Sequence, residues 1–297
     1  MKREIHPCTV QIYLFPTFFH TSLISELTHL HICALRISLP ANLIELDKIR
    51  VAAVSYLNTK PLLYGIKRSE KLMKMMELVE DYPASIAQML INNEVDMGLV
   101  PVAIIPQLKE WHIVSDFCIG AIEKVASVCL FSHEPMDKVE KVVLDYQSRT
   151  SVELCKLLLK DYWKKEVVFE KAGKDYIQNI QQKTGGVIIG DRALEQRGNF
   201  PFIYDLAEAW IKFTGKPFVF AAWIANKPIP KSFIQLFNKA NAEGVNNLNK
   251  VVAENPYRAY DLDKYYSKNI SYDLDSKKRE GLDMFLKLLE KAEPVAQ

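Results

Sequence analysis

Glycine is scarce in this 297-residue chain, with 11 in total and none before Gly65. Neither the Walker A loop nor the pattern G-x-G-x-x-G occurs, so the glycine-rich loops that cradle phosphates are absent. The nucleophile elbow G-x-S-x-G and the zinc motif H-E-x-x-H are absent as well. Nucleotide binding, dinucleotide binding and α/β-hydrolase chemistry therefore lose their main support in the sequence.

Histidine and cysteine are equally uninformative as catalytic or metal-binding groups. Only two of the six histidines, His112 and His133, follow residue 48, which leaves little material for a histidine base or a histidine-rich metal site. The five cysteines are odd in number and form no C-x-x-C pair. We therefore expect no disulfide framework, no metal, no cofactor and a reducing compartment.

No charge of one sign dominates the chain. Lys and Arg number 38 against 36 Asp and Glu, a net charge of +2. This balance provides no electrostatic footprint for nucleic acid or for an anionic membrane surface. No apolar run reaches the roughly 18–20 residues of a membrane span. A small acidic ligand is compatible with this balance, because it requires only a local positive potential.

Residues 1–48 differ from the remainder of the chain. They lack glycine, contain four of the six histidines, and have apolar stretches interrupted by Pro16 and His20. We expect a non-native or disordered extension, with the natural start near residues 46–50. A signal peptide is the alternative, because Lys2 and Arg3 precede an apolar zone, but no clean cleavage site follows.

From residue 49 onward, short apolar runs alternate with helical patterns, which predicts an α/β fold with parallel βαβ units. Two longer apolar stretches, Val125–Phe131 and Pro217–Ile224, separate two such series. We expect a two-lobed clamshell with these stretches as hinge strands and the C-terminal helices on the first lobe. The first lobe would comprise residues 49–136 and 224–297, and the second residues 137–223. One continuous sheet without a cleft is the alternative. The expected elements are strands at 50–55, 76–80, 97–102, 141–144, 167–169 and 186–190, and helices at 82–91, 148–163 and through 230–290.

Four strand-to-helix junctions are rich in short polar side chains. Free backbone N–H groups at such helix starts, together with hydroxyl and amide side chains, suit a ligand that carries carboxylates. Ordinary N-capping is the alternative at each junction. Arg149 and Arg192 would either clamp a carboxylate or form salt bridges with neighbouring acids, and the sequence leaves both open. The junctions are Ser55–Thr59, Asp81–Ser85, Ser148–Ser151 and Gly190–Arg192.

The first junction, Ser55-Tyr56-Leu57-Asn58-Thr59-Lys60-Pro61-Leu62, resembles the N-terminal signature of the chorismate dehydratases, which open the futalosine route to menaquinone. Further segments resemble the same family in the same order, so the resemblance covers nearly everything after residue 48. It departs at Ile122-Glu123-Lys124, because the resemblance implies a glycine within this turn. The other matching segments are 96–102, 127–132, 148–151, 189–194, 204–210 and 214–221.

The resemblance implies a cytoplasmic enzyme with the fold of type II periplasmic binding proteins. Its reaction, that of a hydro-lyase, converts chorismate to 3-[(1-carboxyvinyl)oxy]benzoate by loss of water. Asn58 and Ser127 would contact chorismate near the reacting carbons, and a group at the third junction would bind a carboxylate. The base would be a carboxylate of the substrate itself or, as the protein alternative, Asp191. The remaining expected binding residues are Tyr56, Ser85, Ser148, Arg149, Thr150 and Ser151.

Two other functions remain open from the sequence. A solute-binding protein for a small carboxylic acid would need export and hence an N-terminal signal. The sister lyase of the same route would require a catalytic histidine in the cleft. A homodimer is one alternative for the assembly.

Overall fold

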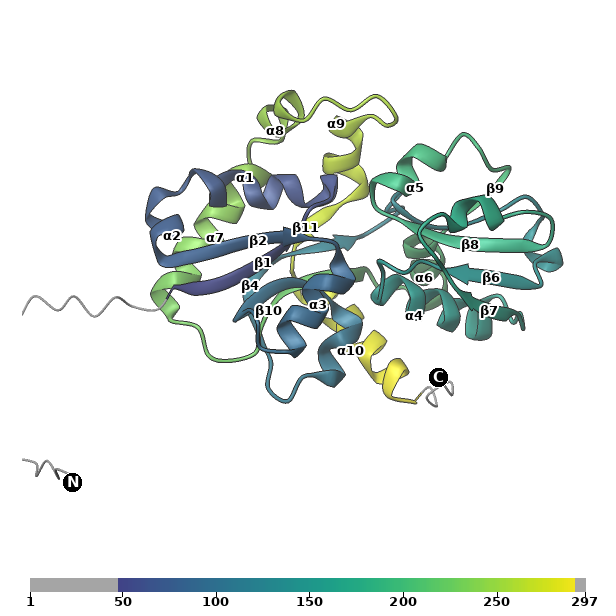
Figure 1. Ribbon diagram of the computed structural model, residues 1–297, viewed down its shortest axis with the longest axis horizontal. Helices are drawn as coiled ribbons and strands as arrows, with labels where there is room; N and C mark the ends of the chain where they lie inside the picture. Colours follow the sequence, from purple (N-terminus) through teal and green to yellow (C-terminus); the bar gives the residue numbers. More distant parts are fainter. Residues whose placement is uncertain (1–47, 292–297) are drawn as a thin grey trace, which may run out of the picture. The chain divides into compact units, whose positions relative to one another are not determined.

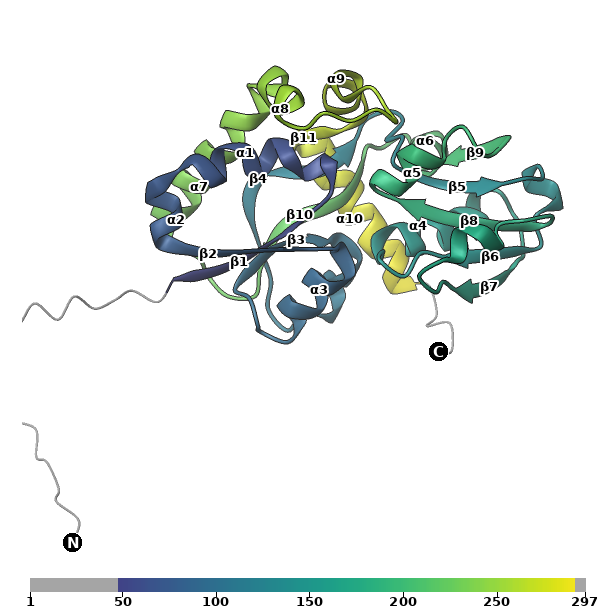
Figure 2. The ribbon, with the colours of Figure 1, turned by 45° about the horizontal axis from the view of Figure 1, so that its top comes forward.

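The computed structural model describes residues 48–291, so the expectations for the N-terminal extension, apart from Lys48, lie outside the described residues. Within this range the strands form a sheet of six and a sheet of five, which lie next to each other in both Figure 1 and Figure 2. One hydrophobic core continues through both sheets, with Val51 and Leu99 in the first and Leu130 and Val187 in the second. The expected α/β fold is confirmed.

The first sheet has the strand order β11-β4-β10-β3-β1-β2. Strands β1, β2 and β3 are parallel, whereas β10 runs antiparallel to both β3 and β4. All eight residues of β10 are buried, because helices cover both faces of this part of the sheet. The strands are β1 (Ile49–Val54), β2 (Met76–Asp81), β3 (Met97–Pro101), β4 (His112–Ala121), β10 (Phe218–Ala225) and β11 (Ser271–Asp273).

The second sheet has the order β7-β6-β8-β5-β9. Strand β6 is parallel to β7 and β8, whereas β5 is antiparallel to β8 and β9. Both sheets are therefore mixed, so the expectation of parallel units holds only within each βαβ series. The strands are β5 (Val128–Ser132), β6 (Lys141–Leu144), β7 (Val168–Lys171), β8 (Thr184–Ile189) and β9 (Phe202–Asp205).

Helices α1 and α7 pack on each other over the first sheet, and α10 packs along β10, as Figure 2 shows. The C-terminal helices therefore lie on the first lobe, as expected. The helices are α1 (Lys60–Arg68), α2 (Glu70–Met75), α3 (Pro83–Ile91), α4 (Thr150–Leu157), α5 (Asp191–Gln196), α6 (Leu206–Thr214), α7 (Lys231–Val245), α8 (Leu248–Glu254), α9 (Leu262–Lys264) and α10 (Ser276–Lys291). Short 3-10 turns are η1 (Leu57–Thr59), η2 (Val102–Gln107), η3 (Met136–Lys138) and η5 (Tyr176–Asn179), and π-helical turns are η4 (Leu158–Tyr162) and η6 (Tyr265–Asn269).

The chain crosses between the two sheets at points that differ from the predicted lobe limits. Residues 122–127 lead from β4 in the first sheet to β5 in the second, and the chain returns between β9 and β10. The predicted limits lay at 136/137 and 223/224, because an apolar run indicates a buried strand without indicating the sheet in which it pairs. The expected helical tail also contains β11, which pairs with β4.

Candidate functional site

A cavity of about 50 Å³ lies where the carboxyl ends of β1 and β3 meet the start of α4, a volume that holds only a few water molecules. Open α/β sheets bind ligands at these strand ends. No His, Asp, Glu, Lys, Arg or Cys lines this cavity in the part of the chain that the structure describes. Its lining residues are Val54, Tyr56, Asn58, Pro83, Pro101, Ile119, Val128, Ser148, Thr150, Ser151, Ile189, Gly190 and Phe220.

The side of the cavity formed by the second sheet carries the hydroxyl groups. Ser148, Thr150 and Ser151 surround the first turn of α4 and are buried. The Ser148 Oγ accepts the N–H of Ser151 at 3.2 Å, and the Thr150 Oγ1 accepts the N–H of Ala103 at 3.1 Å. The positive end of the helix dipole together with these hydroxyls favours an anion at this position.

The side formed by the first sheet carries Tyr56 and Asn58 within an apolar surface. Both precede α1, in the turn after β1, where Pro61 at the start of the helix fixes the turn. The Asn58 Oδ1 accepts a hydrogen bond from Thr59 Oγ1 at 3.1 Å. Val54, Ile119 and Phe220 supply the apolar part of this side.

Tyr56 bridges the two sheets through Gln147. The Tyr56 hydroxyl donates to the Gln147 Oε1, which also accepts from Arg192 at 2.8 Å. The backbone oxygen of Gln147 accepts the N–H of Ala84 at 3.1 Å. Burial raises the pKa of Tyr56 well above its ordinary value, so this side chain stays neutral at physiological pH.

Arg192 pairs with Asp145 rather than with the cavity. One guanidinium nitrogen lies 2.9 Å from both oxygens of Asp145, whose side chain is fully buried. Asp145 also accepts the N–H groups of Gln147 and Ile189. Of the two interpretations left open for Arg192, the structure therefore supports the salt bridge. Arg149 donates to the backbone oxygen of Ser148 at 3.0 Å and does not line the cavity.

Asp191 is the first residue of α5, and its carboxylate accepts the N–H of Leu57 at 3.0 Å. Burial raises the pKa of Asp191 to about 6, although the N–H of Leu57 acts in the opposite direction. The carboxylate thus joins the second sheet to the turn that carries Asn58. Asp191 does not line the cavity, whereas its neighbour Gly190 does.

Two further predicted binding residues, Ser85 and Ser127, are not part of the cavity lining. The hydroxyl of Ser85 donates to Asp81 at 2.6 Å. Ser127 is fully buried, and its Oγ accepts from the Tyr265 hydroxyl at 2.7 Å. The structure therefore brings together Tyr56, Asn58, Ser148, Thr150 and Ser151 around the cavity and places Ser85, Ser127, Arg149 and Asp191 outside its lining.

Sequence reasoning named Gly190 only as part of a junction, and it missed Gln147. Gly190 has a φ of +65°, and a Cβ at this position would lie 2.7 Å from Cδ2 of Tyr56. A glycine between a strand and a helix is a signal that could have been used. Gln147 had no such signal, because its partner Tyr56 lies 91 residues away in the chain.

The described residues contain neither a candidate metal cluster nor a candidate membrane span. No group of three or more His, Cys, Asp or Glu side chains in residues 48–291 is arranged to hold a metal ion. Among these same residues, no helix has the length and apolar character needed to cross a bilayer.

A family model and a relative of known activity both connect this chain with menaquinone biosynthesis or chorismate. A family model described as menaquinone biosynthesis matches residues 49–291. A chorismate dehydratase from Thermus thermophilus is 27% identical over 258 residues, covering 79% of this chain and 92% of the relative. A solved protein from Archaeoglobus fulgidus superimposes with a TM-score of 0.67 at 13% identity, covering 84% of this chain and 98% of its own.

The periplasmic aliphatic sulphonate binding protein SsuA from Escherichia coli superimposes with a TM-score of 0.54 at 14% identity, covering 84% and 94% of the two chains. At such low identity these structures establish the fold alone. It is the two-lobed fold of periplasmic binding proteins, as expected.

Proposed function

We propose, from the premise that this chain belongs to the menaquinone biosynthesis family, that it is a chorismate dehydratase. The 27% identity to the Thermus thermophilus enzyme over most of both chains supports this activity. The observation that carries the proposal is the cavity, which combines hydroxyls at a helix start with an apolar surface and lacks a charged side chain in its described lining.

The reaction requires little from the protein apart from binding and one proton transfer. Chorismate loses the proton on C3 and the hydroxyl on C4, and these leave together as water. The ring becomes aromatic, so the overall reaction is favourable. The protein must hold the diene, exclude bulk water and allow the proton to move.

The two sides of the cavity suit the two parts of this substrate. The hydroxyls of Ser148, Thr150 and Ser151, at the positive end of α4, would bind one carboxylate. Asn58 would lie near the reacting carbons, while Ile119 and Phe220 pack against the ring. Chorismate would occupy the cavity between these two sides, which residues of both sheets line.

The substrate's own carboxylate is the base in this proposal. The described lining offers no imidazole, amine or carboxylate, and a water-excluding cavity strengthens a carboxylate as a base. Asp191 is the protein alternative, because burial raises its pKa to about 6. Its carboxylate, however, is directed at the N–H of Leu57.

The variant Asp191→Asn separates these two bases. Asn keeps the shape and an oxygen acceptor for Leu57, so kcat should stay within about 10-fold of wild type if the substrate supplies the base. Loss of about 10³-fold in kcat with unchanged chorismate binding would identify Asp191 as the base instead. Steady-state kinetics and calorimetric binding measure the two quantities.

Incubation with chorismate tests the function itself. We expect the diene absorbance to fall while a benzoate product appears, with water as the only other product. A solute-binding protein would bind chorismate and return it unchanged. Inactivity on chorismate together with activity on a futalosine derivative would indicate the sister lyase.

We place this activity in the cytoplasm, because the three cysteines of the described residues, Cys118, Cys129 and Cys155, are free thiols that a reducing compartment preserves. The substrate would be the partner, without nucleic acid or membrane. The homodimer stays a prediction, to be checked by light scattering.

A further inference from the structure

Tyrosine is concentrated in one segment of the first lobe, residues 257–272. Five of the 13 tyrosines of the chain lie between residues 257 and 272. This segment, which we call the tyrosine segment, includes α9, η6 and β11 and belongs to the first lobe. Three of its hydroxyls bond to Ser127, Asn58 and Asp191, the residues predicted from the sequence to be closest to the reaction.

Tyr265 supports residues 122–127, the connection from β4 to β5, at its last residue. Its side chain is fully buried, and its hydroxyl donates to Ser127 Oγ at 2.7 Å. The backbone oxygen of Ser127 in turn accepts the N–H of Gly190 at 2.8 Å. Gly190 and Val128 both line the cavity. Burial raises the pKa of Tyr265 far above its ordinary value, so the hydroxyl remains a donor at every physiological pH.

Tyr272 supports the opposite turn. It is buried on β11, and its hydroxyl donates to the backbone oxygen of Asn58 at 3.1 Å. Asn58 lines the cavity. The hydroxyls of the two tyrosines, seven residues apart in the chain, thus bond to Ser127 just before β5 of the second sheet and to Asn58 in the turn after β1 of the first sheet.

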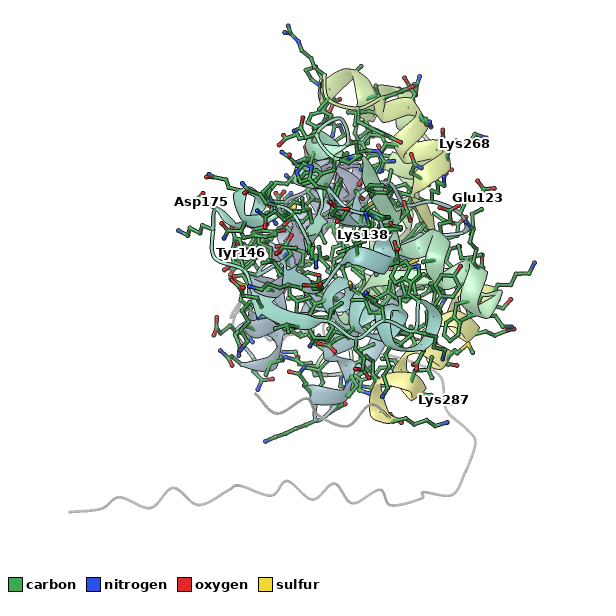
Figure 3. All side chains as sticks on the ribbon, turned by 90° about the vertical axis from the view of Figure 1, so that its right-hand side faces the viewer. Glu123, Lys138, Tyr146, Asp175, Lys268 and Lys287 are labelled. Atoms are coloured by element: carbon green, nitrogen blue, oxygen red, sulfur yellow. The ribbon has the colours of Figure 1, made fainter. Side chains whose placement is uncertain are left out.

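A further bond attaches the tyrosine segment to the crossing residues. The Asn269 side chain donates to the backbone oxygen of Lys124 at 2.9 Å. Figure 3 shows the neighbours of this pair, Glu123 and Lys268, on the same side of the molecule. The crossing residues 122–127 are therefore anchored on the segment at two points, Lys124 and Ser127.

Tyr266 provides an internal comparison. It is as buried as Tyr265, but its hydroxyl has no hydrogen-bond partner among residues 48–291. Removal of this hydroxyl should cost no polar contact, and it relieves an unsatisfied buried group. Tyr265 and Tyr266 are therefore adjacent and similarly buried, but only the Tyr265 hydroxyl bonds to Ser127.

We propose that Tyr265 and Tyr272 are positioning residues. They act through Ser127 and Asn58 to hold the two sides of the cavity in the relative position that the reaction requires. The catalytic consequence rests on the proposed function. Neither tyrosine touches the substrate in this proposal. Loss of either tyrosine hydroxyl should therefore lower kcat more than it raises KM.

The test compares Tyr265→Phe and Tyr272→Phe with the matched control Tyr266→Phe. Each variant removes one hydroxyl and keeps the ring in the core. We expect kcat to fall about 10-fold for Tyr265→Phe and for Tyr272→Phe, with KM within about 2-fold. For Tyr266→Phe both should stay at wild-type values. Equal kcat in Tyr265→Phe and Tyr266→Phe would overturn the proposal.

A double-mutant cycle shows whether Tyr265 acts through Ser127. In a Ser127→Ala background, Tyr265→Phe should change kcat by less than about 2-fold, because the hydroxyl has lost its acceptor. A full additional 10-fold loss in that background would indicate a general structural effect and contradict the positioning role.

Crystal structures of Tyr265→Phe and Tyr266→Phe provide a readout that needs no turnover. We expect the Ser127 side chain to change rotamer, or to occupy two, only in Tyr265→Phe. An unchanged Ser127 would overturn the positioning role. An inactive wild-type protein would instead refute the proposed function, and the Ser127 comparison would still decide the role of Tyr265.

Discussion

The two sides of the cavity differ in chemistry although they belong to similar mixed sheets. The first sheet contributes apolar side chains such as Ile119 and Phe220, with Tyr56 and Asn58 at its rim. The second contributes the hydroxyls of α4. This difference indicates a division of tasks, in which one side holds a ring and the other an anion.

The two sides also differ in how they are fixed. The hydroxyl side depends on the buried ion pair of Asp145 and Arg192 beneath it. The apolar side depends on hydrogen bonds without an ion pair, from the Tyr272 hydroxyl to the backbone oxygen of Asn58 and from the Leu57 N–H to the Asp191 carboxylate. Substitutions that break the ion pair should therefore differ from substitutions that break the hydrogen bonds in their effects on stability and on turnover.

Gly190→Ala should have the largest effect, because it forces the two sides apart. The substituted residue would need a φ of +65° and a ψ of −146°, a region that is nearly exclusive to glycine. Its Cβ would also lie 2.7 Å from the Tyr56 ring. We expect kcat/KM for chorismate to fall about 100-fold or more.

Gly215→Ala is the control for a positive φ without a steric contact, because Gly215 lies in the left-handed helical region. Gly215 has a φ of +71°, but within residues 48–291 no atom beyond its chain neighbours lies within 4 Å of an added Cβ. We expect a loss of about 1 kcal/mol in stability with kcat/KM nearly unchanged. Equal losses of kcat/KM in both variants would show that strain, and not the approach of Tyr56, is responsible.

Arg192→Met tests the support of the hydroxyl side. Asp145 would become a buried carboxylate without its charged partner, so we expect the free energy of unfolding to fall by about 3 kcal/mol. Arg149→Met removes an exposed arginine that bonds to backbone oxygens. We expect it to lower the free energy of unfolding by less than about 0.5 kcal/mol. Urea unfolding measures both, and equal destabilisation would contradict the structural role assigned to Arg192.

Thr150→Val should have the smallest effect on the reaction, and it removes a hydroxyl that also accepts the N–H of Ala103. The variant keeps the shape of the side chain but removes the hydroxyl from the cavity. We expect KM for chorismate to rise about 10-fold with kcat little changed. Thr184→Val, at the far end of β8 from the cavity, is the control and should leave KM unaltered. A wild-type KM in Thr150→Val would remove Thr150 from the anion site.

The elements that the sequence predicted best are those with continuous apolar patterns. The expected strand at 50–55 corresponds to β1, and the expected helix at 82–91 to α3. The pattern did not predict the antiparallel direction of β5 and β10, because strand direction depends on connections that bring the chain back across a sheet. The helix expected at 148–163 ends in a π-helical turn, η4.

For the site, local junctions were more informative than single charged residues. The junctions around Asn58 and Ser148 do line the cavity, because strand ends followed by helix starts lie at one edge of a sheet. Arg149 and Asp191 belong to such junctions too, but their side chains bond to backbone groups instead. The direction in which a side chain points depends on partners that are distant in sequence.

The sequence by itself determined the α/β class, most strands, and the hydroxyl-rich helix start, because periodicity and capping are local properties of the chain. Only the tertiary structure decided that Tyr56 meets Gln147 and Gly190, that Arg192 is neutralised by Asp145, and that Tyr265 reaches Ser127. These contacts join residues that are 47 to 138 positions apart, and burial of the intervening core brings them together. Local patterns carry no information about such pairings, since many chain paths bury the same apolar runs.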